Sequence, residues 1–252
     1  MRRKLVAGNW KMFGEQARVN ALVAELAAQD FSQAAVDVAI IPGFINLQSV
    51  QQQLADTGIE LGAQDCAEQL EYGALTGEVS ALQLAELGCR YVLVGHSERR
   101  ALQSESDQVI CRKFIAAQKA GLIPILCLGE TLAQREAGLA TATVCEQLEA
   151  VMEQVGVDAF EQAVIAYEPV WAIGTGLTAT PEQAQEIHQQ IRQRVAEECS
   201  DVAAQVQILY GGSVKAANAA ELFAMADIDG GLVGGASLDA KEFSAIVSAL
   251  GN

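Results

Sequence analysis

The chain has 252 residues, of which 51% are hydrophobic and 19% charged, which excludes a disordered protein and supports one large hydrophobic core. Its formal net charge of −16 excludes general nucleic-acid binding, because that function needs a cationic surface. No apolar run approaches the length of a membrane span, and the apolar stretch after Lys4 is too short for a signal peptide. We therefore expect a cytoplasmic protein with no membrane or nucleic-acid partner.

Short apolar runs recur along the chain, with amphipathic segments between them. Their spacing of about 31 residues is typical of a (β/α)8 barrel, and their solidly apolar character suits parallel strands covered on both faces. No linker-like stretch interrupts them, so we expect residues 1–252 to form a single α/β domain with this barrel. The predicted strands are Leu5–Asn9, Val36–Ile41, Ile59–Ala63, Tyr91–Gly95, Ile123–Leu128, Val164–Tyr167, Gln207–Tyr210 and Gly231–Val233.

Helical patterns fill the intervals between these strands. Apolar residues recur on one side of Ala17–Gln29 and of Asp107–Ala120. A third helix is predicted over Pro181–Glu198, with Thr180 suited to its N-cap and proline to its first position. His188 stands among glutamines on that helix, and we interpret it as a solvated surface histidine.

Cysteine and histidine usage argues against a metal centre. None of the six cysteines has CxxC or another metal-ligand spacing, and two histidines are too few for a multi-histidine site. In a cytosolic chain we expect the cysteines to be reduced and mostly buried, and we expect no metal ion.

The segment 163–176, with the sequence AVIAYEPVWAIGTG, carries the strongest functional signal. The strand Val164–Tyr167 leads directly to Glu168, and Pro169 favours an extended Glu168 and ends the strand. Residues 170–173 are too apolar for an ordinary exposed loop, and glycines follow them. A catalytic base under a movable lid requires this arrangement. A surface turn with a solvated Glu168 would leave the apolar flap unexplained.

Other polar residues follow the ends of predicted strands, where barrels of this kind build their active sites. Lys11 is either an ordinary exposed charge or the local cation that an acidic protein needs for an anionic substrate. Asn9 either fixes Lys11 or serves only as a turn residue. His96 is either structural or catalytic. If Ser97 and Glu98 begin a helix, its N–H groups would keep the ring neutral and able to shuttle a proton between oxygens.

Two glycine turns end the last two predicted strands. Gly211, Gly212 and Ser213 form one, and Gly234 and Gly235 form the other. The second turn alone could be no more than a tight turn. Because two such turns at adjacent strand ends would present backbone N–H groups together, the pair favours a phosphate site.

Glu168 as base, His96 as electrophile and Lys11 as charge stabiliser fit proton abstraction beside a carbonyl group. Hydride transfer, nucleotide hydrolysis and acyl transfer fit poorly, since the chain lacks GxGxxG, P-loop and Ser–His–carboxylate patterns. A sugar-phosphate isomerase is our first hypothesis. A phosphate-binding epimerase or lyase would need a metal cluster or a Schiff-base lysine. A non-catalytic phosphate-binding scaffold would leave Glu168 and its flap unexplained.

Five motifs resemble the triosephosphate isomerase family, and they span Leu5 to about Leu238. They are Asn9–Lys11, Gly95–Arg100, Ala166–Gly176, Tyr210–Val214 and Leu232–Leu238. The resemblance implies a TIM barrel and an intramolecular aldose–ketose isomerase of glycolysis and gluconeogenesis. It would interconvert dihydroxyacetone phosphate and D-glyceraldehyde 3-phosphate through an enediolate, without a cofactor. The family is the standard example of a glutamate base, a neutral histidine and a closing loop, so this scheme is the family's own.

The resemblance also implies individual roles. Glu168 would be the base, His96 the neutral electrophile, and Lys11 with Asn9 the stabilisers of developing charge. Ser97 and Glu98 would support them. The phosphate would rest on Gly174, Ser213, Gly234 and Gly235, and residues 169–176 would close over it.

Outside the active site, the resemblance implies a homodimer. Thr76, in the segment 73–78, would reach the site of a neighbouring subunit. Two residues depart from the family pattern. Asp65 stands where asparagine is usual and adds charge near the dimer loop, and Gly231 replaces a larger residue and is expected to loosen packing.

Overall fold

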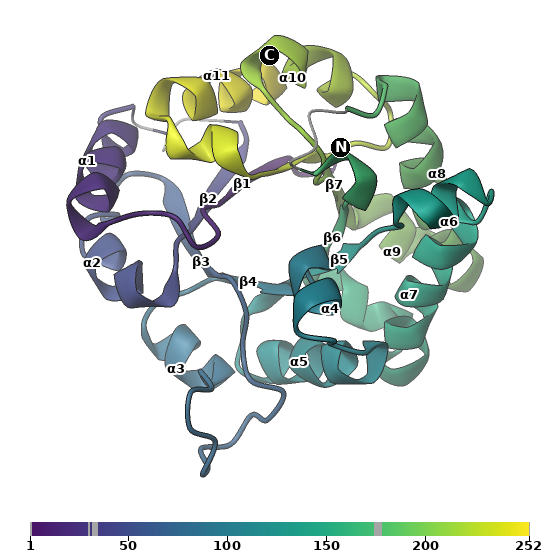
Figure 1. The fold of residues 1–252 in the computed structure, drawn as a ribbon, viewed down its shortest axis with the longest axis horizontal. Coiled ribbons are helices and arrows are strands. Elements are labelled where there is room, and N and C mark those ends of the chain that lie inside the picture. Colours follow the sequence, from purple (N-terminus) through teal and green to yellow (C-terminus); the bar gives the residue numbers. More distant parts are fainter. Residues whose placement is uncertain (1, 30, 32–34, 174–177, 252) are drawn as a thin grey trace.

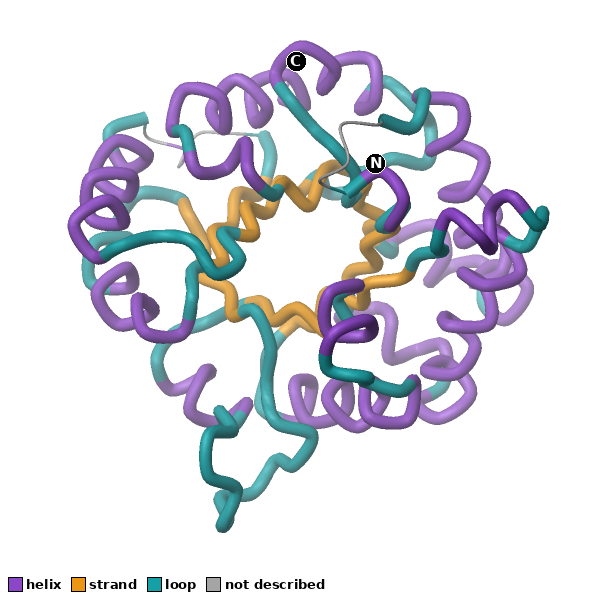
Figure 2. The backbone as a smooth tube through the Cα atoms, in the orientation of Figure 1, coloured by secondary structure: helices purple, strands orange, loops and turns teal. Residues whose placement is uncertain are grey.

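The computed structural model describes residues 2–29, 31, 35–173 and 178–251. In this part of the chain, eight parallel strands close into a barrel in the order of the sequence, and helices surround it (Figures 1 and 2). The predicted barrel is confirmed. The strands are β1 (Leu5–Asn9), β2 (Asp37–Ile41), β3 (Ile59–Ala63), β4 (Tyr91–Val94), β5 (Ile123–Leu128), β6 (Val164–Tyr167), β7 (Gln207–Tyr210) and β8 (Gly230–Val233).

The predicted strand bounds differ from the observed ones by at most one residue. β4 stops before Gly95, whose φ of +73° cannot continue an extended strand. β8 begins one residue earlier than predicted because Gly230 pairs with Leu5 and closes the barrel. β2 begins at Asp37 rather than Val36.

The helices cover the outside of the barrel. No helix in the described ranges is both long and apolar enough to cross a membrane. The α-helices are α1 (Gln16–Ala27), α2 (Leu47–Gln51), α3 (Ala81–Glu86), α4 (Ser97–Leu102), α5 (Asp107–Lys119), α6 (Leu132–Glu136), α7 (Ala140–Val155), α8 (Pro181–Glu198), α9 (Ser200–Gln205), α10 (Ala216–Phe223) and α11 (Ala240–Gly251). The 3₁₀ helices are η2 (Phe44–Asn46), η3 (Val157–Gln162), η4 (Val170–Ala172) and η5 (Gly235–Leu238).

α8 begins and ends as predicted. The Thr180 hydroxyl accepts the Gln183 N–H at 3.2 Å, and the Gln183 side chain accepts the Thr180 N–H at 3.0 Å. This capping box satisfies donors that the first turn would otherwise leave free.

Along every strand except β3, apolar side chains alternate between two cores, as the pleat of a strand requires. One core fills the inside of the barrel and the other lies between strands and helices. The inner core consists of Leu5, Ala7, Ala39, Ile41, Tyr91, Leu93, Ile125, Cys127, Val164, Ala166, Leu209 and Leu232. The alternation determines which side chain of each strand lies at the mouth of the barrel, the end formed by the carboxyl ends of the strands.

The interpretation of His188 as a surface residue is wrong. Its side chain is fully buried, packs edge-on against Tyr167 and lies 3.1 Å through Nδ1 from the Asp227 carbonyl oxygen. Burial lowers the pKa of His188 to about 4, so the ring is neutral. The buried side chains of α8 recur at positions 184, 187, 188, 191 and 195, and this helical spacing places His188 on the inner face.

A buried ion cluster closes the bottom of the barrel, at the amino ends of the strands. Asp229 is fully buried and accepts hydrogen bonds from Arg2 Nε at 2.7 Å, Arg192 Nη2 at 2.6 Å and the Ile208 N–H at 3.0 Å. Since Arg2 precedes β1 and Asp229 precedes β8, this cluster joins the two ends of the strand order.

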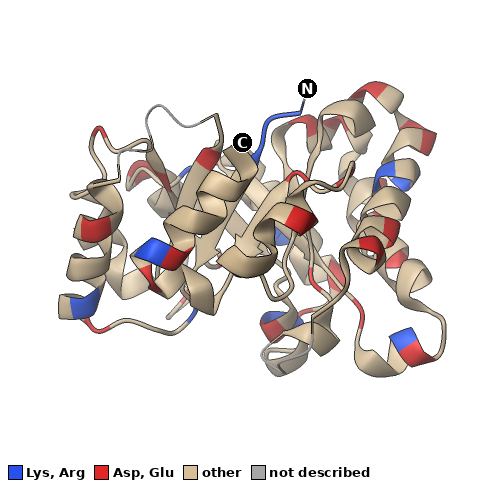
Figure 3. Cartoon of the chain, turned by 90° about the horizontal axis from the view of Figure 1, so that it is seen from above, with Lys and Arg blue, Asp and Glu red and all other residues tan. Residues whose placement is uncertain are grey.

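Acidic residues outnumber basic ones in the chain, with 32 Asp and Glu residues against 16 Lys and Arg, and they are distributed over many of its elements (Figure 3). Residues 64–80, between β3 and α3, form a loop that projects beyond the ring of helices (Figure 1). Asp65 lies at its base, where Lys113 Nζ contacts both carboxylate oxygens at 2.7 and 2.8 Å. At Gly231, the ring of Phe223 lies 3.3 Å from where a Cβ would be, so this ring fills the space beside the small residue.

Candidate active site

Strand alternation brings distant residues to the carboxyl end of the barrel. On β1, Leu5 and Ala7 point inward, so the next inward positions are Asn9 and, beyond the strand, Lys11. On β6, Val164 and Ala166 point inward, and Glu168 follows them with the same period. A one-residue shift would have turned Asn9 or Glu168 toward the helices.

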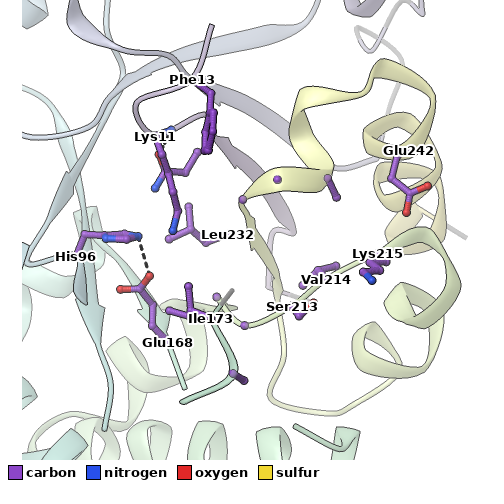
Figure 4. A pocket seen from close by; sticks show the side chains of 17 residues that line it. Lys11, Phe13, His96, Glu168, Ile173, Ser213, Val214, Lys215, Leu232 and Glu242 are labelled. Carbon is purple, nitrogen blue, oxygen red and sulfur yellow. Dashed lines mark hydrogen bonds and ion pairs between the residues drawn. The ribbon is translucent and has the colours of Figure 1, made fainter. Parts of the chain in front are cut away.

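These side chains line one cavity of about 530 Å³ at the mouth of the barrel (Figure 4). Of the predicted site residues that the structure describes, seven line it: Asn9, Lys11, His96, Glu168, Ser213, Gly234 and Gly235. Gly174 and the rest of residues 174–176 lie outside the described residues. Ser97 and Glu98 lie directly behind the cavity wall, where they contact Glu168 and Lys11.

Glu168 is the buried carboxylate of this cavity. Its Oε1 lies 2.9 Å from His96 Nε2, and its Oε2 accepts the Ser97 N–H at 3.0 Å. Burial raises the pKa of Glu168, but the His96 ring and the Ser97 N–H lower it by more, so the pKa lies below its ordinary value. An ionised carboxylate at neutral pH follows, held in a nearly dry site.

The backbone sets the tautomer of His96. The Glu98 N–H, in the first turn of α4, donates to Nδ1 at 3.2 Å, so the ring proton is on Nε2 and points toward Glu168. Burial lowers the pKa of His96 and the Glu168 carboxylate raises it by more, leaving the pKa above its ordinary value. A protonated ring would nevertheless carry a second proton on Nδ1, where it would point at the Glu98 N–H. This geometry favours the neutral ring.

Lys11 is fixed through its backbone. Its φ is +51°, a left-handed value that few lysines adopt. The Asn9 side chain accepts its N–H at 2.9 Å, and Gln64 Nε2 donates to its carbonyl oxygen at 2.7 Å. The ammonium group lies 2.5 Å from Glu98 Oε1. Gln64 was not predicted from the sequence as a site residue. It directly follows β3 and contacts the backbone of Lys11 after β1.

Ser213, Gly234 and Gly235 line the cavity after β7 and β8, and Ser213 lies on the opposite side of the cavity from His96 (Figure 4). A Cβ at Gly235 would meet no atom within 4 Å, so packing inside the protein does not explain this glycine. Its open side is space that a ligand in the cavity can use, which favours the phosphate interpretation over the tight turn.

The described part of the flap is anchored beside Glu168. Trp171 Nε1 donates to Glu130 Oε1 at 2.8 Å, and the Tyr167 hydroxyl lies 3.1 Å from the same oxygen. Arg135 lies over the Trp171 ring, with its guanidinium carbon 4.7 Å from the ring centre. The start of the flap therefore has defined polar partners, and Glu130 was not predicted from the sequence.

Several further cavity residues were missed by sequence reasoning. They are Phe13, Val214, Lys215, Leu232, Ala236 and Glu242. The cavity is also lined by Gly211 and Gly212 of the predicted glycine turn and by Ala172 and Ile173 of the predicted flap. Leu232 could have been found from its place two residues before Gly234 on the inner face of β8. Nothing in the local sequence around Glu242 points to the cavity.

Cys127 is fully buried behind Glu168, and burial raises the pKa of its thiol well above the ordinary value. A reactive thiolate is therefore disfavoured. Thr76 is exposed on the projecting loop and does not line the cavity of its own chain. Within the residues described, no group of three or more His, Cys, Asp or Glu side chains is arranged to hold a metal ion.

Comparison with known proteins identifies the relatives of this chain. The family model described as triosephosphate isomerase matches residues 4–250. The curated triosephosphate isomerases of Ectopseudomonas mendocina (strain ymp) and Pseudomonas entomophila (strain L48) are each 59% identical to this chain over 252 residues. That of Pseudomonas aeruginosa (strain LESB58) is 57% identical. In all three comparisons, 100% of both chains is covered.

Proposed function

The chain belongs to the triosephosphate isomerase family and is an isomerase of dihydroxyacetone phosphate and D-glyceraldehyde 3-phosphate, and we propose that Glu168, His96 and Lys11 carry out this reaction. The observation that carries the proposal is the 2.9 Å contact between Glu168 Oε1 and His96 Nε2 on a cavity that also contains Lys11. The base, the neutral proton donor and the cation thus face one substrate-sized space.

Binding places the phosphate against Ser213 and the backbone N–H groups of Gly234 and Gly235, as in the family. The triose then extends toward His96 and Lys11 across the cavity (Figure 4). Gly174 is proposed as a further phosphate contact when residues 169–176 close. Closure would exclude water from the intermediate and suppress the loss of its phosphate.

Glu168 removes a proton from the carbon next to the carbonyl group, and the electron pair of that C–H bond moves through the carbon skeleton onto the carbonyl oxygen. Lys11 and Asn9 stabilise the negative charge of the enediolate. His96 gives its Nε2 proton to one enediolate oxygen and receives a proton from the other. Glu168 then returns its proton to the neighbouring carbon. This scheme is the one for which the family is known.

His96 stays neutral during this sequence because it loses its contact with Glu168. Among the groups that raise the pKa of His96, the Glu168 carboxylate contributes most through its contact with the ring, and the Glu98 carboxylate contributes less. When Glu168 turns to the substrate carbon, this contact is lost, while burial and the Glu98 N–H at Nδ1 remain. Both of these favour the uncharged ring.

We also propose a homodimer. Met12, Ile45 and Tyr72 are largely exposed on the segments that follow the adjacent strands β1, β2 and β3, and Thr76 lies on the loop that projects from β3. Such a cluster of exposed apolar side chains is typical of an interface. Light scattering should give about twice the chain mass of 26.6 kDa, and a monomer at micromolar concentration would contradict the proposal. Location in the cytoplasm is likewise proposed, supported by the six free cysteines, all of them within the described residues.

A coupled assay of the purified protein with D-glyceraldehyde 3-phosphate tests the function. Turnover that is unchanged by EDTA is expected, because the proposed steps use only side chains of this chain. Loss of activity on chelation would favour a metal-dependent reaction instead. Absence of turnover in a folded protein that binds 2-phosphoglycolate would favour a non-catalytic binding protein.

A further inference from the structure

The cavity is unevenly charged, and its inner end carries no net positive charge. The Lys11 ammonium lies 2.5 Å from the Glu98 carboxylate, and the ionised Glu168 lies beside the neutral His96. One positive charge therefore faces two negative ones. Because the whole chain has a formal charge of −16, this end of the cavity cannot by itself attract a doubly charged phosphate.

A second cation lines the other end of the cavity. Lys215 follows Ser213 and Val214 directly and precedes α10, far from the Glu168–His96 pair (Figure 4). It is exposed, and within the described ranges it forms no ion pair, in contrast to Lys11. Its charge is thus available to a ligand held near Ser213.

Glu242 opposes this charge. It belongs to α11 and lines the same end of the cavity, where its Oε1 accepts the Ala216 N–H at 2.8 Å. This N–H opens α10, and helix starts favour anions. The carboxylate therefore occupies a position attractive to a phosphate and repels a dianion that approaches Ser213.

We propose that Lys215 is the capture cation for the phosphate end of the substrate, and that Glu242 offsets it and limits its strength. This inference rests on the proposed function and adds a specificity residue to the same site. Lys215 favours a doubly charged phosphate monoester over a singly charged or neutral ligand, since each added negative charge on the ligand is attracted by its ammonium group. Lys215 acts on binding and leaves the chemical step at Glu168 unchanged.

The test compares Lys215→Gln with Lys241→Gln, a matched control. Lys241 is an exposed lysine of α11 outside the cavity lining, and either substitution changes the net charge from −16 to −17. At low ionic strength, Lys215→Gln should raise KM and the Kd of 2-phosphoglycolate by about three- to tenfold. This is the effect expected when one positive charge near a partly solvated phosphate is removed. Lys241→Gln should change them less than about twofold, and added salt should shrink the difference.

A neutral substrate separates charge from structure. Turnover of D-glyceraldehyde, which lacks the phosphate, should be the same in wild type and Lys215→Gln. Glu242→Gln, which keeps an oxygen for the Ala216 N–H, should tighten 2-phosphoglycolate binding by about twofold or more.

Two results would overturn the inference. One is equal phosphoglycolate affinity in the Lys215 and Lys241 variants, and the other is an equal loss of D-glyceraldehyde and phosphorylated-substrate turnover in Lys215→Gln. If the wild type does not isomerise the triose phosphate, the proposed function fails, while calorimetry with 2-phosphoglycolate still tests Lys215.

Discussion

The two ends of the barrel both gather charged side chains from distant segments, but with different partners. At the bottom, Asp229 is fully buried and accepts hydrogen bonds from two arginines and a backbone N–H. At the mouth, Glu168 has one backbone donor and one neutral ring, and it faces a cavity of about 530 Å³. A carboxylate whose hydrogen-bonding capacity is fully used, such as that of Asp229, is fixed in place. A carboxylate with few partners beside a cavity, such as that of Glu168, can move to a substrate.

This difference predicts opposite consequences of similar substitutions. A buried charge with several oppositely charged or hydrogen-bonded partners contributes to stability, because its removal leaves those partners buried and unpaired. A catalytic charge contributes to turnover, and the folded protein is often less stable than it would be with another residue at that position. The following substitutions test this contrast.

Glu168→Gln should have the largest effect. The amide can still accept the Ser97 N–H but cannot take a proton from carbon, so kcat should fall by about 10³-fold or more. Binding of 2-phosphoglycolate should survive, and the free energy of unfolding should equal or exceed that of wild type. Steady-state kinetics, calorimetry and urea unfolding measure the three. Near-normal turnover would remove Glu168 from the role of base.

Asp229→Asn should show the reverse pattern. The amide would face Arg2 and Arg192 without a negative charge, which should lower the free energy of unfolding by about 3 to 5 kcal/mol. kcat per folded molecule should stay close to wild type, because the residue lies at the opposite end of the barrel. Urea unfolding with parallel assays measures both, and a loss below about 1 kcal/mol would show that the cluster is not a main support.

His188 predicts an intermediate, pH-dependent effect. Its pKa of about 4 in the folded protein lies below the ordinary 6.5, so the unfolded state binds the proton more tightly. Stability should therefore fall as pH drops from about 6.5 to about 4, by roughly 3 kcal/mol from this residue. The His188→Gln variant should lack this contribution to the pH dependence of its free energy of unfolding. Urea unfolding of both proteins over that range gives the difference, and parallel pH curves would contradict it.

Asp65→Asn should have the smallest effect. Burial raises the pKa of Asp65 by more than Lys113 and Arg99 lower it, so its charge stabilises little. Lys113 keeps a contact with Glu105 in the variant. We expect a change within about 1 kcal/mol, in contrast to Asp229. A loss above about 2 kcal/mol, or a shift of the dimer on dilution, would show that Asp65 holds the projecting loop.

The sequence predicted the strands well because each is a compact apolar run with a clear stop. Pro169 after Glu168 is such a stop, and strand alternation then orients the residue that follows. The same logic placed Asn9 and Lys11 at the mouth. The local sequence pattern is sufficient to predict a site residue where that residue directly follows the end of a strand.

Residues that act across the fold were harder to predict. Gln64 binds the backbone of Lys11, and Glu242 reaches the cavity from the last helix. Their roles follow from barrel closure, which no local pattern encodes. His188 failed for a different reason, since its glutamine neighbours hid the apolar spacing of Ile187 and Ile191.

Two glycines confine Glu168 from neighbouring strand ends. A Cβ at Gly129 would lie 1.9 Å from the Glu168 carbonyl oxygen, and a Cβ at Gly211 would lie 2.9 Å from Glu168 Cγ. The walls of this slot are main chain, which cannot rotate away as a side chain does. Directed evolution of this protein thus has almost no latitude at these two positions.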